Sequence, residues 1–250
     1  MTEALPTGVR DKIWSAVAEI LDGDDSGHGM DHIRRVHGMA ISFADRVDES
    51  VDRVVVELSA LLHDVDDYKL VGREQAERLT NASKVMDSIG VDSETQAAVR
   101  EVIANMGYSN SLRGIRPITI EGEVVSDADM CDAIGASGIV RALEYAVSSK
   151  GSGVVFDRTV WPIINITAEQ YNSSGSSHET DSFINHFFEK LLWLKGMMLT
   201  EPGRREAEVR DQQMVEFLRA FFREEKASDW EDLLERFIVE RKSLAGGPSE

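Results

Sequence analysis

The chain has 250 residues, of which 42% are hydrophobic and 29% charged, and this excludes collagen-like, wholly disordered and disulfide-rich classes. The formal net charge of −18 opposes contact with nucleic acid and anionic lipid, so neither is expected as a partner. No apolar run suits a membrane helix, the start MTEALPTGVRDKIW lacks the order of a signal peptide, and the single Cys131 cannot form an intrachain disulfide. We therefore expect a reducing, cytoplasmic location.

Hydrophobic residues recur at helical spacing through most of the chain, whereas alternation of strand type is nearly absent. The pattern predicts an all-α protein with a single domain over residues 1–244 and a flexible tail over 245–250. The C-terminal helices either pack back on the same core or form a small appendage. Residues 148–178 are rich in Gly, Ser and Asn, which predicts a long loop, a lid or a short strand pair. In chain order, the predicted helices cover about 8–22, 30–44, 50–65, 72–89, 93–106, 121–147, 179–197, 203–225 and 229–242.

Ionisable residues follow directly on the most apolar of these helices, in LSALLHDVDDYK. His63 and Asp64 are adjacent there, and an imidazole and a carboxylate side by side can both reach one divalent cation. The alternative is a solvated helix end, where a cationic His63 would be stabilised by the negative end of the helix dipole.

Further candidate ligands lie on two other predicted helices. His32 is on the preceding helix, and Asp127, Asp129 and Asp132 follow one another on a later helix among small apolar residues. Acids in such a stretch are costly to bury unless they bind a cation or pair with a base. Two histidines and two aspartates form a nitrogen and oxygen set suited to Mn, Mg, Fe, Ni or Zn.

These residues resemble the signature of the HD-domain superfamily of metal-dependent phosphohydrolases, an all-α fold with a histidine, a vicinal His-Asp pair and a distant aspartate. The blocks HxxRV, LLHDVDDYK, DADxxDAIGAxGIxRA and INHFFEKLLWLK are similar, in this order, to a small bacterial-type subfamily that includes nucleoside triphosphate pyrophosphohydrolases. The resemblance covers about residues 28–225.

The resemblance implies a role for each matching residue. The implied metal ligands are His32, His63, Asp64 and Asp129, the last because the family's ligand is the acid of an alanine-aspartate pair. Asp67 matches the acidic residue that acts as general acid or base, and on a continuing helix it would project beside Asp64. The alternative is that Asp67 supports a metal ligand without touching the metal, or is simply solvated. Relatives with two metals need two more histidines between positions 64 and 129, and this chain has none there, so one divalent metal is expected.

Basic residues near these motifs are candidates for holding a phosphate, because a metal alone leaves a di- or triphosphate undercompensated. Lys69 follows the acidic run, and Arg35 lies one turn beyond His32; His186 and Lys190 share a face in INHFFEKLLWLK. Each of them, taken alone, is more often a salt-bridge partner.

The sequence therefore predicts a phosphohydrolase that cleaves a phosphoester or phosphoanhydride, with a nucleotide as substrate, by a metal-activated water. The alternative is a non-catalytic module of the same fold that binds a phosphorylated ligand. The exact substrate, the metal and the oligomeric state stay open.

Overall fold

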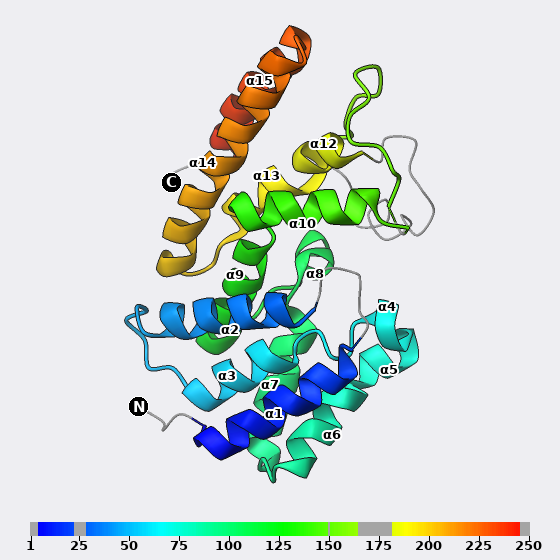
Figure 1. The fold of residues 1–250 in the computed structure, drawn as a ribbon. Helices are drawn as coiled ribbons and strands as arrows, with labels where there is room; N and C mark the ends of the chain where they lie inside the picture. The colour runs from blue at the N-terminus through cyan, green and yellow to red at the C-terminus, as the bar shows by residue number, and fades with distance from the viewer. Residues whose placement is uncertain (1–4, 23–28, 150, 165–181, 246–250) are drawn as a thin grey trace. The chain divides into compact units, whose positions relative to one another are not determined.

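The computed structural model describes residues 5–22, 29–149, 151–164 and 182–245 (Figure 1). The described residues form helices and connecting segments without a strand, so the all-α prediction is confirmed. None of the described helices is both long enough and apolar enough to cross a membrane. The predicted strand pair is absent from the described part of 148–178; the rest of that segment and tail residues 246–250 lie outside the described ranges.

Contacts divide the chain into two compact units, which are described one at a time. The first comprises Met1–Asp132 with Leu199–Gly203, and the second comprises Ala133–Met198 with Arg204–Glu250. The single domain over 1–244 therefore stays a prediction. The helices of the first unit are α1 (Thr7–Ile20), α2 (Met30–Ala44), α3 (Arg53–Leu62), α4 (Tyr68–Val71), α5 (Arg73–Arg78), α6 (Thr80–Ser88), α7 (Ser93–Asn105), α8 (Tyr108–Leu112) and α9 (Ile120–Asp132).

The second unit begins with α10 (Gly135–Val147) and continues after a long connection. A π-helical turn over Phe187–Leu191 follows α12, and a 3₁₀ turn over Lys195–Met197 follows α13. The remaining helices are α12 (Phe183–His186), α13 (Leu192–Leu194), α14 (Glu201–Glu224), whose first turn belongs to the first unit, and α15 (Ser228–Ala245).

Two of the predicted helices are each divided in two. Leu79 adopts a left-handed conformation (φ 49°) between α5 and α6. Gly135, the first residue of α10, has φ 78°, and a Cβ atom there would lie 2.9 Å from Cβ of Arg210. Hydrophobic spacing resumes beyond both breaks, so periodicity alone does not reveal them. The second break makes Asp132 the last residue of α9.

Helix α3 lies at the centre of the first unit and contacts α1, α2, α7 and α9. Asp52 caps its start by accepting the N–H groups of Val54 (2.9 Å) and Val55 (3.3 Å). Eight of its ten residues are buried, which agrees with its wide apolar stripe. The buried apolar faces of α2 and α3 fix the positions at which their ionisable residues emerge.

Asp127 ties α9 to the start of α14 within the first unit. Its fully buried carboxylate accepts the N–H groups of Leu199 (2.8 Å) and Thr200 (2.7 Å) and the hydroxyl of Thr200 (2.7 Å). A Cβ atom on Gly203 would lie 2.1 Å from Oδ2 of Asp127, so this approach requires glycine. One of the three candidate aspartates of α9 is therefore engaged with a helix N-terminus.

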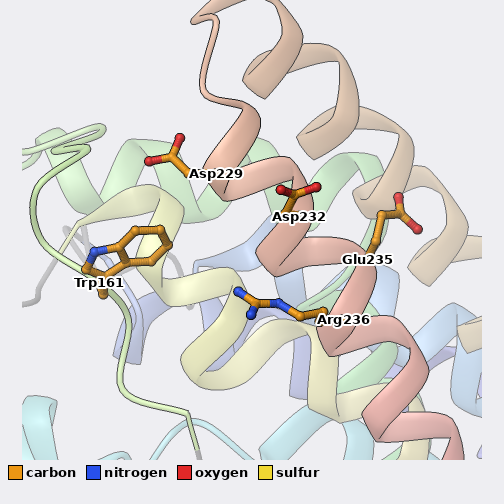
Figure 2. A pocket seen from close by; sticks show the side chains of 5 residues that line it. All are labelled: Trp161, Asp229, Asp232, Glu235 and Arg236. Atoms are coloured by element: carbon orange, nitrogen blue, oxygen red, sulfur yellow. The ribbon is translucent and has the colours of Figure 1, made fainter.

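Aromatic side chains fill the second unit between α14 and α15. Trp230 is fully buried, and its ring stacks on Trp161 with centroids 4.9 Å apart. A hollow of about 440 Å³ lies beside this pair and is lined by Trp161, Asp229, Asp232, Glu235 and Arg236 (Figure 2). Arg158 binds Asp229 and Arg219 binds Glu235, so two of its acids have basic partners. The lining lacks histidine and does not resemble the predicted metal site.

Candidate metal centre

His63 and Asp64 follow α3 immediately, in a turn over residues 63–66. The helix ends at Leu62 rather than at about residue 65, so His63 occupies its C-cap. Nδ1 of His63 lies 3.0 Å from the carbonyl oxygen of Ala60 and donates to it. This hydrogen bond fixes the tautomer, so that Nε2 of His63 carries the lone pair that can coordinate a metal ion.

His32 lies in the first turn of α2, and its ring nitrogens face two different neighbours. Nδ1 is 2.7 Å from Oδ2 of Asp132, while Nε2 is 3.1 Å from Nε2 of His63. Nε2 is also 3.2 Å from Oδ2 of Asp64 and 3.5 Å from Oδ1 of Asp129. The side chain of His32 is 1% exposed, so its ring lies in the interior.

The four predicted ligands therefore converge from α2, the end of α3, and α9. Nε2 of His63 completes the group, at 3.4 Å from Oδ2 of Asp64 and 3.8 Å from Oδ1 of Asp129. The donor atoms of His32, His63 and Asp129 all lie within 4.8 Å of one another. Asp64 is outside that group of three, but its Oδ2 lies close to both Nε2 atoms, and two imidazole nitrogens with two adjacent carboxylates form a donor set that fits a divalent cation.

Electrostatics at this point favour positive charge. Burial by itself lowers the pKa of His32, but the carboxylates of Asp132 and Asp64 outweigh burial and raise this pKa to about 9. Burial raises the pKa of Asp132, yet hydrogen bonds from His32 and Arg35 bring it far below its usual range. The carboxylate field that favours a proton on His32 also attracts a metal cation.

Asp66 fixes the turn that carries the His-Asp pair. It is buried and accepts the N–H groups of Asn81 and Ala82, each at 2.8 Å, at the start of α6. The amide of Asn81 donates back to the carbonyl oxygen of Val65 at 2.8 Å. Sequence reasoning gave this acid no role, and no local pattern indicates it, because its partners lie 15 and 16 residues away.

Asp67 is the predicted proton-transfer residue. The expected continuing helix does not form; instead the N–H of Asp67 donates to the carbonyl oxygen of Asp64 at 3.1 Å. Asp67 is half-buried, and α4 begins at the next residue. The turn keeps the backbone of Asp67 beside that of Asp64. This backbone contact does not test proton transfer, so the role of Asp67 stays a prediction.

Two predicted phosphate contacts belong to the first unit. Nε and Nη2 of Arg35 donate to the two oxygens of Asp132, at 2.6 and 2.9 Å. Lys69 lies in α4, and its side chain is outside what the structure describes.

The other two, His186 and Lys190, belong to the second unit, at the end of α12 and in the π-helical turn. Burial lowers the pKa of His186 to about 3, aided by the positive charges of Lys190 and Arg141. His186 is therefore a neutral imidazole at pH 7, not a cation. Arg141, on α10, is a basic residue that sequence reasoning left without a role; its place in the DADxxDAIGAxGIxRA block was the available signal.

The helical fold and the His-Asp cluster define a metal-binding protein of the HD class. A family model for the HD domain matches residues 29–134, which include His32, His63, Asp64 and Asp129. A relative, YpgQ of Bacillus subtilis, is 35% identical over 213 residues, covering 84% of this chain and 90% of YpgQ. The chain therefore belongs to the HD superfamily of hydrolases, as its sequence motifs indicated.

Solved structures agree with this assignment. A Lactobacillus plantarum protein is 32% identical, with a TM-score of 0.73 over 89% of this chain and 99% of that one. An HD-superfamily hydrolase from Bacillus thuringiensis is 35% identical, with a TM-score of 0.65 over 87% and 97%. The crystal structure of YpgQ in complex with ADP aligns with a TM-score of 0.63 at 30% identity, over 86% and 97%.

Proposed function

We propose that this chain is a metal-dependent phosphohydrolase that cleaves a phosphoester or phosphoanhydride of a nucleotide. The convergence of two imidazole Nε2 atoms and two carboxylates carries the proposal. Its membership in a hydrolase superfamily supports the reaction class. The ADP complex of the YpgQ relative supports a nucleotide as substrate.

His32, His63, Asp64 and Asp129 would hold one divalent ion, with Mn, Mg, Fe, Ni and Zn as candidates. When bound, such an ion activates water at neutral pH and neutralises charge on phosphoryl oxygens. The protein's own contribution is to fix both imidazole tautomers, since each Nδ1 is already engaged, with Asp132 or with Ala60.

Asp67 would take the proton from the attacking water and deliver it to the leaving group. Support comes from its turn, which holds its backbone one hydrogen bond away from that of the ligand Asp64.

Lys69, Lys190 and His186 are proposed to contact the phosphate groups. In a chain of net charge −18, a polyphosphate approaches only where local cations outweigh the general repulsion. Lys69 and Lys190 are the first candidates to test, because Lys69 follows closely on the turn that carries the His-Asp pair and Lys190 lies four residues after His186. A neutral imidazole can still donate one hydrogen bond to a phosphate oxygen.

The test is release of phosphate or pyrophosphate from a panel of nucleoside mono-, di- and triphosphates, with each candidate metal supplied in turn. Phosphate is measured with and without added inorganic pyrophosphatase, which separates the two products. Asp129→Ala protein, purified identically, controls for contaminating phosphatases. Turnover by the parent alone supports the proposal. Nucleotide binding without turnover by the metal-loaded parent favours the non-catalytic module.

A further inference from the structure

Asp132 lies behind one metal ligand. Its carboxylate is fully buried at the end of α9, and Oδ2 accepts the Nδ1–H of His32 at 2.7 Å. Nε2 of the same ring is the atom that faces His63 and Asp64. Because one imidazole nitrogen must carry the proton in the neutral ring, a carboxylate at Nδ1 assigns Nε2 to the metal.

Arg35 holds this carboxylate with a two-pronged contact. Its Nε is 2.6 Å from Oδ1 of Asp132 and its Nη2 is 2.9 Å from Oδ2. Arg35 follows His32 by three residues on α2, so one helix face presents both donors to a single carboxylate on α9. Parallel N–H bonds from a planar guanidinium fix the plane of the carboxylate as well as its position.

The two ligand histidines are oriented in different ways. His63 donates to a backbone carbonyl of its own helix, three residues earlier, which is a neutral and local partner. His32 donates to an ionised side chain that comes from another helix and is itself bound by Arg35. α9 therefore supplies a predicted metal ligand, Asp129, and one turn later the carboxylate that orients a second ligand.

We infer that Asp132 and Arg35 act together as positioning residues that direct Nε2 of His32 to the metal and raise the metal affinity of the centre. The inference deepens the proposed function and rests on its metal site, but not on its substrate. Arg35 then acts through Asp132, which differs from the phosphate contact that the sequence suggested.

Metal titration of the full-length protein tests the inference, with binding of Co²⁺ followed by visible absorption and binding of Mn²⁺ by calorimetry. Asp132→Asn keeps the size of the side chain but places an amide N–H₂ against either Arg35 or His32. Loss of an orienting partner typically lowers metal affinity about 10- to 100-fold, and we expect this range for Asp132→Asn and for Arg35→Met. The double variant should be no weaker than Asp132→Asn alone, because both changes break one network.

Glu57→Gln is the matched control, since Glu57 on α3 is another buried carboxylate that accepts an N–H from a histidine of α2. It should leave metal affinity unchanged. Circular dichroism and thermal melting establish that each variant is folded; if Asp132→Asn does not fold, Arg35→Met and Arg35→Lys give the answer. Arg35→Lys should recover only part of the affinity, because lysine keeps the charge and loses the fork.

Folded Asp132→Asn or Arg35→Met protein with the parent's metal affinity would overturn the inference. A raised KM for nucleotide in Arg35→Met with unchanged metal affinity would also overturn it, in favour of a substrate contact. Reduced metal affinity in these variants, with no phosphorylated compound turned over by the parent, would uphold the inference and refute the proposed function.

Discussion

Helices α2 and α3 take part in two clusters of buried ionisable groups, and the two clusters differ in how their charges are matched. His32 on α2 and His63 at the end of α3 belong to the metal centre. His37 on α2 and Glu57 on α3 belong to a second cluster, with Nε2 of His37 3.2 Å from Oε1 of Glu57. Both clusters combine imidazole with carboxylate, so residue type alone does not separate them.

In the Glu57 cluster, basic side chains bind the carboxylate and balance its charge. Glu57 is 1% exposed and accepts hydrogen bonds from Arg10, from His37 and from the N–H of Leu5. Burial raises the pKa of Glu57, but the bonds from His37 and Arg10 outweigh it and lower this pKa below its usual value. One acid with an arginine and a histidine has its charge balanced, and such a cluster joins helices without a ligand.

The metal centre has the opposite balance. The carboxylates of Asp64 and Asp129 lie 3.2 and 3.5 Å from Nε2 of His32, which itself lies beside Nε2 of His63, and Arg35 binds Asp132 behind His32. Acceptors gathered in the interior favour a cation. A buried acid therefore indicates a ligand site when other acceptors lie around it, and a structural contact when a basic residue pairs with it.

The largest effect is expected when a ligand of the metal centre is removed. His63→Ala or Asp64→Ala should abolish stoichiometric metal binding and with it turnover, because each removes a ligand and the charge or geometry that goes with it. Elemental analysis after dialysis measures the metal, with about one ion per chain expected in the parent. His37→Ala is the control from the Glu57 cluster, and this variant should keep the ion of the metal centre. Two ions per chain in the parent, or undiminished binding in both ligand variants, would contradict the assignment.

The next effect separates proton transfer from metal binding. Asp67→Asn should keep the metal and lower kcat about 100-fold or more, the usual loss for a general acid or base. Steady-state kinetics on metal-loaded protein, with metal content measured on the same sample, provide the check. A parent-like rate with metal retained would assign Asp67 to solvation or to support of its turn.

A smaller effect concerns cations outside the ligand set. Lys69→Ala or Lys190→Ala should raise KM for a nucleoside triphosphate about 5- to 150-fold, because a charged hydrogen bond to phosphate is lost. This factor corresponds to a loss of about 1 to 3 kcal/mol in binding free energy. Metal occupancy should not change. Parent-like kinetics in both single variants and in the double variant would move the phosphate contacts to other residues, beginning with Arg141 beside His186.

The last prediction concerns the stability that the Glu57 cluster provides, and it leaves function unchanged. Glu57→Gln should lower the free energy of unfolding by about 2 kcal/mol at pH 7 and leave metal binding and turnover unchanged. Because the folded state lowers the pKa of Glu57, this stabilisation is present above the usual carboxyl pKa and is lost as pH falls through the folded value. Urea titrations between about pH 3 and 7 should therefore converge for parent and variant at the acid end. A constant difference across this range would show that Glu57 is not the titrating group.

Much of this protein was predictable from the sequence, because the deciding features are local or repeat at a fixed spacing. Helical periodicity predicted the all-α class, and the His63-Asp64 pair after an apolar helix predicted a centre at its end. The HD family followed from the order of its motifs. Helix breaks at Leu79 and Gly135 were missed, because the first depends on a left-handed residue that is not glycine and the second on a close approach to Arg210.

The three aspartates of α9 show what only the tertiary structure decides. Asp127, Asp129 and Asp132 lie within six residues on one helix. Asp127 binds a helix start more than 70 residues later, Asp129 faces the two histidines, and Asp132 pairs with His32 and Arg35 about 100 residues earlier. Sequence can show that acids among small apolar residues need partners if they are buried, because an unpaired buried charge is costly. The role of each aspartate is determined by its partner, and which partner it obtains depends on how helices distant in the sequence pack together.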